Sequence, residues 1–109
     1  MGTAPEPPYV AVIFTTRRAG ESDGYEQTAA RMREMACQSD GFLGIESARD
    51  PDGTAITVSY WRDEASARRW RLDPEHLAAQ QAGRERWYES YEVRIARVER
   101  ARSFERPEA

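Results

Sequence analysis

The chain has 109 residues, of which 39% are hydrophobic and 32% are charged, a composition typical of one globular domain. Its 16 basic and 19 acidic residues give a formal net charge of −3, which argues against a surface built to bind nucleic acid. All the basic residues are arginines, so no lysine can form a Schiff base, and the single Cys37 and single His76 are too few for a disulfide or a conventional zinc site.

The two ends of the chain differ in composition from its middle. Residues 1–8 hold three prolines within four positions, which predicts a flexible leader and no secretory signal, and residues 102–109 predict a polar tail. The longest apolar run, from Tyr9 to Phe14, is far shorter than the ~18 residues that a membrane helix needs. We therefore expect one domain over residues 9–101 that contacts no membrane, and the lone cysteine favours a reducing cytoplasm.

A strand and a helix are expected in the first part of this domain. Residues 9–16 are rich in β-branched and aromatic side chains and predict a strand with both faces at least partly covered. Asp23 is followed by Glu26 at the spacing of a capping box, which predicts the start of a helix over residues 24–38. The segment Ser39-Asp40-Gly41 predicts the end of that helix.

A hairpin follows the first helix. Residues 42–49 and 54–61 are typical of two strands that share a turn. The intervening Asp50-Pro51-Asp52-Gly53 supplies a proline for one turn position and a glycine for a positive φ. The sequence therefore predicts two antiparallel neighbours in one sheet.

Two short helices and a long strand complete the predicted elements. Asp63 is a suitable N-cap for the first of these helices, and Asp73-Pro74 is a suitable start for the second. The final strand, over residues 87–100, alternates in polarity and is long enough to project beyond its own sheet. The order strand, helix, strand, strand, helix, strand is that of the split βαβ, ferredoxin-like fold, an α+β class with an antiparallel sheet and helices on one face.

The sheet face without helices leads to a prediction about assembly. Its apolar and aromatic side chains need cover, which the same face of a second copy can supply about a two-fold axis. We therefore expect a homodimer in which two sheets form an α+β barrel. The end of the last strand can then pair with the edge of the partner's sheet, which removes an aggregation hazard.

Three segments of the sequence resemble a known family: Phe42-Leu-Gly44 in one strand, Thr57-Val-Ser-Tyr-Trp61 in the next, and Ala67-Arg-Arg-Trp70 in the following helix. They are similar to the antibiotic-biosynthesis monooxygenase (ABM) domain family of dimeric α+β barrels, in particular to a bacterial branch. The likeness covers nearly all of the chain between its tails. Related barrels include quinone-forming monooxygenases, haem-degrading enzymes, isomerases and proteins without known activity, so the resemblance implies the fold more firmly than the chemistry.

The haem-degrading branch can be compared residue by residue. It resembles this chain in a helix tryptophan, Trp70, but also uses an asparagine on the first strand and an iron-ligating histidine nearly three turns after the tryptophan. Gln80 stands where that histidine should be, and the chain has no asparagine. The comparison argues against haem turnover, with His76, one turn earlier, as the remaining candidate ligand from a shifted position.

The resemblance to the quinone-forming branch implies oxidation of a phenolate by O₂ without metal or flavin. This chemistry needs an apolar pocket, a proton acceptor and a donor for the developing anion. His76, near a helix N-terminus that disfavours imidazolium, is the predicted acid–base residue, and the alternative is an exposed or capping histidine. Arg86, among cations and aromatic rings, is predicted to stabilise an anionic intermediate, and the alternative is a solvated helix end.

Five residues are predicted to line the substrate pocket between the sheet and the helices: Phe14, Met32, Val58, Tyr60 and Trp70. Because Tyr60 and Trp61 lie on opposite faces of one strand, only one of them can point toward the helices, and we expect it to be Tyr60, with Val58. Trp70 has simple core packing as its alternative role.

These observations lead to three functional hypotheses. The first is a cofactor-independent monooxygenase that oxidises a small phenol or hydroquinone with O₂. The second is a non-catalytic dimeric barrel that binds a small hydrophobic metabolite, and the third is a haem-binding and haem-degrading monooxygenase. A pocket filled by the protein's own side chains would favour the second hypothesis.

Overall fold

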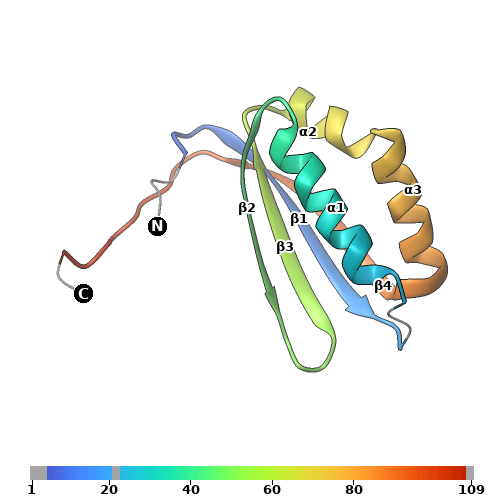
Figure 1. The fold of residues 1–109 in the computed structure, drawn as a ribbon. Coiled ribbons are helices and arrows are strands. Elements are labelled where there is room, and N and C mark those ends of the chain that lie inside the picture. The colour runs from blue at the N-terminus through green and yellow to red at the C-terminus, as the bar shows by residue number, and fades with distance from the viewer. Residues whose placement is uncertain (1–4, 21–22, 108–109) are drawn as a thin grey trace.

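The computed structural model describes residues 5–20 and 23–107, which form a four-stranded antiparallel sheet with helices on one face (Figure 1). In chain order the elements are β1 (Tyr9–Arg18), α1 (Tyr25–Gln38), β2 (Phe42–Arg49), β3 (Thr54–Trp61), α2 (Glu64–Arg71), α3 (Pro74–Ala82), the π-helix η1 (Gly83–Trp87) and β4 (Tyr88–Val98). The sheet order β2-β3-β1-β4 is that of the split βαβ fold. The predicted α+β, ferredoxin-like class is confirmed.

The predicted ends of the chain are described only in part. Residues 1–4 of the predicted leader and residues 108–109 of the predicted tail lie outside the described residues. Beyond β4, residues 99–107 form no helix or strand and run away from the sheet, on the same side as the N-terminal segment (Figure 1). None of the described helices is long and apolar enough to cross a membrane.

The central strand β1 determines which side chains face the helices. It pairs antiparallel with β3 on one side and with β4 on the other. Val12 lies opposite Ser59 of β3, and both side chains face the helix layer, where they line a cavity. Ile13 lies opposite Val58, and because successive side chains alternate, this pair projects from the opposite face. We call the face that carries Ile13 and Val58 the outer face of the sheet.

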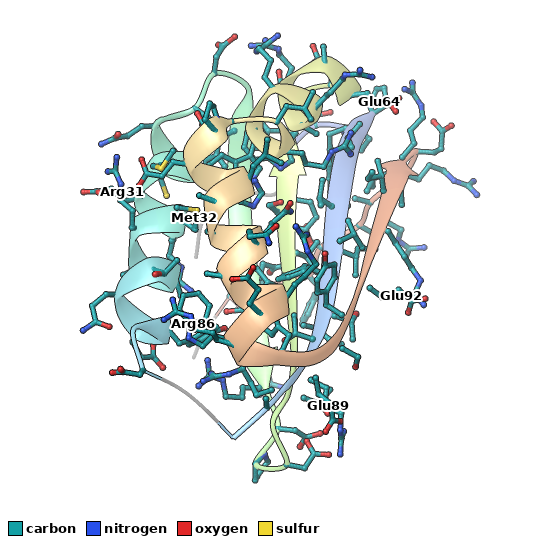
Figure 2. The ribbon with its side chains drawn as sticks, turned by 90° about the vertical axis from the view of Figure 1, so that its right-hand side faces the viewer. Arg31, Met32, Glu64, Arg86, Glu89 and Glu92 are labelled. Atoms are coloured by element: carbon teal, nitrogen blue, oxygen red, sulfur yellow. The ribbon has the colours of Figure 1, made fainter. Side chains whose placement is uncertain are left out.

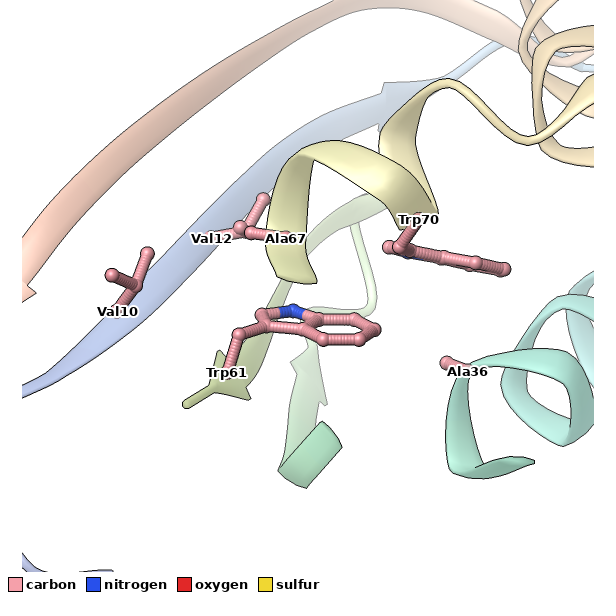
Figure 3. Close-up of a cluster of buried hydrophobic side chains, with 6 residues drawn as sticks. All are labelled: Val10, Val12, Ala36, Trp61, Ala67 and Trp70. Atoms are coloured by element: carbon pink, nitrogen blue, oxygen red, sulfur yellow. The ribbon is translucent and has the colours of Figure 1, made fainter. Parts of the chain in front are cut away.

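The buried core lies between β1, β3 and the two helices that cover them (Figure 3). Its members are Val10, Val12, Ala36, Trp61, Ala67 and Trp70. Trp61 is fully buried, and its Nε1 donates a hydrogen bond to Ser59 Oγ at 2.9 Å, which satisfies the indole N–H. The indoles of Trp61 and Trp70 stack with ring centroids 6.2 Å apart, and both point toward Ala36 of α1. The stacking of one tryptophan of β3 on one of α2 therefore packs α2 against the sheet.

Two of the three predicted side-chain caps are confirmed. The side chains of Asp63 and Asp73 accept backbone hydrogen bonds from the first turns of α2 and α3, at 2.8 and 2.9 Å. The capping box predicted at Asp23 is wrong. Gly24 occupies the N-cap of α1 in the left-handed conformation, with φ 81°, and no side chain of the described residues caps this helix.

The last helix continues into a π-helix before the final strand begins. Because η1 occupies residues 83–87, β4 starts one residue later than predicted, and it ends at Val98. The Trp87 indole Nε1 donates to the carbonyl oxygen of Asp23 at 2.9 Å, and the Trp87 carbonyl accepts from Ala19 N at 2.8 Å. η1 therefore joins the end of β1 to the start of α1 and of β4.

Candidate functional site

A cavity of about 470 Å³ lies between the sheet and the helix layer, within the size range of small-molecule sites. All four strands and all the helices contribute to its wall. The wall is mostly apolar and aromatic, and includes Val12, Phe14, Met32, Trp70, Trp87 and Val93. In Figure 2 the Met32 side chain lies on the side of α1 that faces α3. The space is open, so the protein's own side chains do not fill it.

His76 lies in the wall of this cavity, beside Trp70 of the core. Its ring stacks on the Trp70 indole with centroids 4.1 Å apart, and its Nδ1 lies 3.0 Å from the Trp70 carbonyl oxygen. Because a carbonyl oxygen only accepts, this contact requires the proton on Nδ1 and leaves Nε2 with a lone pair. Burial lowers the pKa of His76 below its ordinary 6.5, while the Trp70 carbonyl and the charge of Asp73 act in the opposite direction. At neutral pH the ring is uncharged and can accept a proton at Nε2.

Tyrosines cluster at another part of the cavity wall. The rings of Tyr88 and Tyr91 lie 5.7 and 5.4 Å from Phe14, and the Tyr25 ring lies 6.1 Å from Tyr88. Burial raises the pKa of the Tyr88 phenol, and the neighbouring Tyr25 hydroxyl adds to the rise. Arg84 Nη1 donates to the Tyr91 hydroxyl at 3.1 Å. The Tyr88 phenol therefore stays protonated at neutral pH and can donate a hydrogen bond but cannot act as a base.

The charged residues of the wall are mostly arginines. Arg33, Arg49 and Arg71 line the cavity, against a single acidic residue among those that the structure describes, Glu26. The Glu26 carboxylate lies 3.8 Å from the Arg49 guanidinium, in an exposed ion pair. Arg71 Nη1 is buried and has no hydrogen-bond acceptor among the described residues. The cavity therefore combines an apolar lining with an excess of positive charge.

Metal-ligating side chains are not gathered in this way. Within residues 5–20 and 23–107, no three histidine, cysteine or carboxylate side chains come together as possible metal ligands. Cys37, near the end of α1, is an exposed free thiol outside the cavity wall.

Four predicted site residues come together in the wall: Phe14, Met32, Trp70 and His76. Trp70 was predicted to line the pocket or to pack in the core, and it does both. One neighbour of its ring is the buried Trp61 of the core, and the other is His76 in the cavity wall.

The direction predicted for Tyr60 and Val58 is wrong, because Trp61 is the β3 side chain that packs under α2 and alternation then turns its neighbours outward. On the outer face the Tyr60 hydroxyl donates to the Glu46 carboxylate at 2.6 Å, and its ring lies 5.6 Å from Tyr9. This hydrogen bond, with burial, raises the pKa of Tyr60 to about 12. Neither Tyr60 nor Val58 lines the cavity.

Arg86 lies outside the cavity, so the predicted contact with an anionic intermediate there is wrong. It is exposed, its guanidinium lies 4.9 Å from the Trp87 ring centroid, and it is absent from the cavity wall. In Figure 2 it lies beside the end of the helix layer. Arg71, for which the sequence predicted no role, lines the cavity instead. The only signal for it in the sequence is its position four residues after the apolar Ala67, which places both residues on one side of the helix.

Relatives of this chain are found by sequence. The family model "Antibiotic biosynthesis monooxygenase" matches residues 8–82. The chain is 49% identical over 105 residues to the uncharacterized protein YqjZ of Bacillus subtilis (strain 168), a match that covers 96% of this chain and 92% of that protein. It is 38% identical over 93 residues to the jasmonate monooxygenase ABM of Pyricularia oryzae, covering 81% of this chain and 42% of that protein.

Solved structures share the fold at low sequence identity. SnoaB, a cofactor-independent oxygenase from Streptomyces nogalater, matches with a TM-score of 0.73 at 18% identity, covering 87% of this chain and 97% of that one. Rv0793 from Mycobacterium tuberculosis matches with a TM-score of 0.75 at 15% identity, covering 87% and 99%. At this low identity the solved structures show only a shared fold, whereas the matches by sequence show family membership. The chain belongs to the antibiotic biosynthesis monooxygenase family.

Proposed function

We propose that this chain is a cofactor-independent monooxygenase that oxidises a small phenol or hydroquinone with O₂. The observation that carries the proposal is a partly buried His76 in the wall of an apolar cavity, with its Nδ1 3.0 Å from the Trp70 carbonyl oxygen. The family match supports the class of reaction. SnoaB, which has the same fold, is a cofactor-independent oxygenase and so agrees with it.

His76 is the base in the proposed reaction. Its Nε2 accepts the phenolic proton, and the Nδ1–H bond to the Trp70 carbonyl holds the imidazolium that forms. The phenolate then transfers one electron to O₂, and the two radicals combine into a carbon-bound peroxide. Tyr88, which keeps its phenolic proton, is a candidate donor to the developing negative charge.

The overall reaction balances without an external reductant. A hydroquinone and O₂ give a hydroxyquinone and water: the substrate loses four electrons, one oxygen atom enters the product and the other leaves as water. His76 returns its proton to the departing oxygen. The protein's own groups therefore supply proton transfer, orientation and exclusion of water.

The proposal includes a homodimer formed through the outer face of the sheet. Ile56 on this face is 44% exposed, and it lies next to Thr15 of β1 and Ala48 of β2. A second copy of the same face would bury this surface about a two-fold axis and leave both helix layers outside. Each cavity would then remain open on its own side of the assembly.

The proposed function is tested by oxygen consumption with a panel of hydroquinones and anthrones. We expect turnover by the unaltered protein and a kcat lower by about 10²- to 10⁴-fold in His76→Ala, the usual contribution of a positioned base. Leu77→Ala is the matched control, because Leu77 is the next residue of α3 and is exposed. Its kcat should stay within about twofold of the unaltered protein.

Two outcomes would contradict the proposal. Oxygen consumption that is equal in His76→Ala and in the unaltered protein would remove His76 from the reaction. Tight binding of the panel compounds without any oxygen consumption would favour a dimeric barrel that only binds a hydrophobic metabolite.

A further inference from the structure

The cavity wall is positively charged in a protein whose net charge is negative. The chain carries a formal net charge of −3. Its cavity nevertheless has three arginines in the wall, of which only Arg49 has the carboxylate of Glu26 nearby, at 3.8 Å. Arg33 and Arg71 form no ion pair with any described residue. An apolar site with this charge is suited to an anion rather than to a neutral or cationic ligand.

Among the arginines of the cavity wall, Arg71 has a buried guanidinium nitrogen that lacks a hydrogen-bond acceptor in the part of the chain that the structure describes. Its Nη1 is buried and finds no acceptor among the described residues, so this nitrogen has lost water without gaining a protein partner. The neighbouring Arg69, on the same helix, shows the usual arrangement, because its Nη2 lies 3.2 Å from the Asp40 carboxylate. The guanidinium of Arg71 therefore carries a desolvation cost that an anion in the cavity would offset.

The helix end alone does not account for Arg71. Cations in the last turn of a helix favour its C-terminal dipole, and Arg68 and Arg69 already occupy the last turn of α2 from its exposed side. Arg71 differs from both because it lines the cavity, next to Trp70 in sequence. The stacked Trp70 and His76 rings belong to the same wall.

We infer that Arg71 binds the carboxylate of an aromatic acid whose ring occupies the cavity. The planar guanidinium matches a carboxylate with two parallel N–H···O bonds, and the apolar wall accepts the ring. The inference rests on the proposed function for the statement that this cavity is the substrate site. It narrows the substrate class to phenols or hydroquinones that also carry a carboxylate.

The test compares two ligands of the same shape, 2-naphthoate and 2-naphthamide, by isothermal titration calorimetry without turnover. We expect the unaltered protein to bind the acid roughly 10- to 100-fold more tightly than the amide, as a charge-assisted contact predicts. In Arg71→Met the preference should vanish while the affinity for the amide changes by less than about twofold. Arg68→Met, on the exposed side of the same helix, should keep the preference.

Folding of the variant is checked independently. Because the buried Nη1 has no acceptor to lose, Arg71→Met should melt at the same temperature as the unaltered protein or higher. Arg71→Lys retains the positive charge but lacks the paired N–H donors of a guanidinium. It should therefore keep only part of the preference for the acid over the amide.

Three results would overturn the inference: equal affinities for acid and amide, no binding of either ligand, or an unchanged preference in Arg71→Met. The proposed oxygenase can fail separately. A charge preference that depends on Arg71, without oxygen consumption on any substrate, would keep the acid site and remove the oxygenase.

Discussion

The tautomer of His76 follows from the position of a single backbone carbonyl. The Trp70 carbonyl oxygen lies 3.0 Å from Nδ1 and is already the acceptor for Asp73 N at 3.2 Å, at the turn between α2 and α3. The same short turn that ends α2 thus presents an acceptor to the first turn of α3. An imidazole with a fixed orientation therefore results from local backbone geometry.

The pH dependence of the proposed reaction follows from the lowered pKa of His76. A histidine with a pKa below 6.5 is neutral above that pH, so the initial rate of oxygen consumption should be constant from about pH 6.5 to 8. As the pH falls through the lowered pKa, Nε2 becomes protonated and the rate should fall by about tenfold per pH unit. The residual rate of His76→Ala should lack this acidic limb. A midpoint above 6.5 would contradict the assignment.

The direction in which an individual side chain points was only partly predictable from the sequence. Alternation established that Tyr60 and Trp61 face opposite sides, but it could not decide which side carries the helices. The decision comes from a long-range contact, the stacking of Trp61 on Trp70, which no local pattern contains. The buried, unpartnered nitrogen of Arg71 was equally invisible, because its burial depends on the walls that other elements supply.

At the scale of elements, η1 connects the last helix, α3, to the final strand, β4. The sequence predicted the hairpin, both aspartate caps and the order of strands, because each of these depends on residues close in the chain. It did not predict a π-helix, whose hydrogen bonds span one more residue than those of an α-helix and have no simple residue signature. The π-helix ends at Trp87, which forms long-range hydrogen bonds with Asp23 and Ala19.

A glycine in η1 positions Tyr88 in the cavity wall. A Cβ on Gly83 would lie 2.6 Å from the Cε2 atom of the Tyr88 ring, so Gly83→Ala must displace that ring. We expect a loss of about 1–3 kcal/mol in the free energy of unfolding, measured by urea denaturation, and a raised KM for the oxidised substrate. Gly20→Ala is the control, because nothing lies within 4 Å of its Cβ position. Equal stability of the two variants would show that Tyr88 is not held by Gly83.

At the scale of the whole molecule, the two faces of the sheet have different surroundings. One face is covered by helices and encloses the cavity, while no helix of the described residues covers the outer face (Figure 1). Sequence patterns predicted this asymmetry, since the order of elements places both crossovers on one side. What covers the outer face depends on a second molecule, so it stays a prediction.

The proposed dimer is tested by placing a charge on the outer face. We expect the unaltered protein to sediment at twice the 12.5 kDa of one chain, and Ile56→Arg to sediment as a monomer at micromolar concentration. An arginine there would put two like charges into an apolar interface at a cost of several kcal/mol. Leu72→Arg, an exposed apolar residue on the helix side, should leave the dimer intact. A monomeric unaltered protein would contradict the proposed assembly.

The placement of the three indoles gives the molecule an intrinsic optical reporter. Trp61, Trp70 and Trp87 are all buried, and two of them line the cavity. Their fluorescence emission is therefore shielded from bulk water, and a guest in the cavity would quench or shift it without any attached dye. The emission maximum of the tryptophans would move to longer wavelengths when the chain unfolds. Binding in the cavity and folding can therefore be followed in one spectrum.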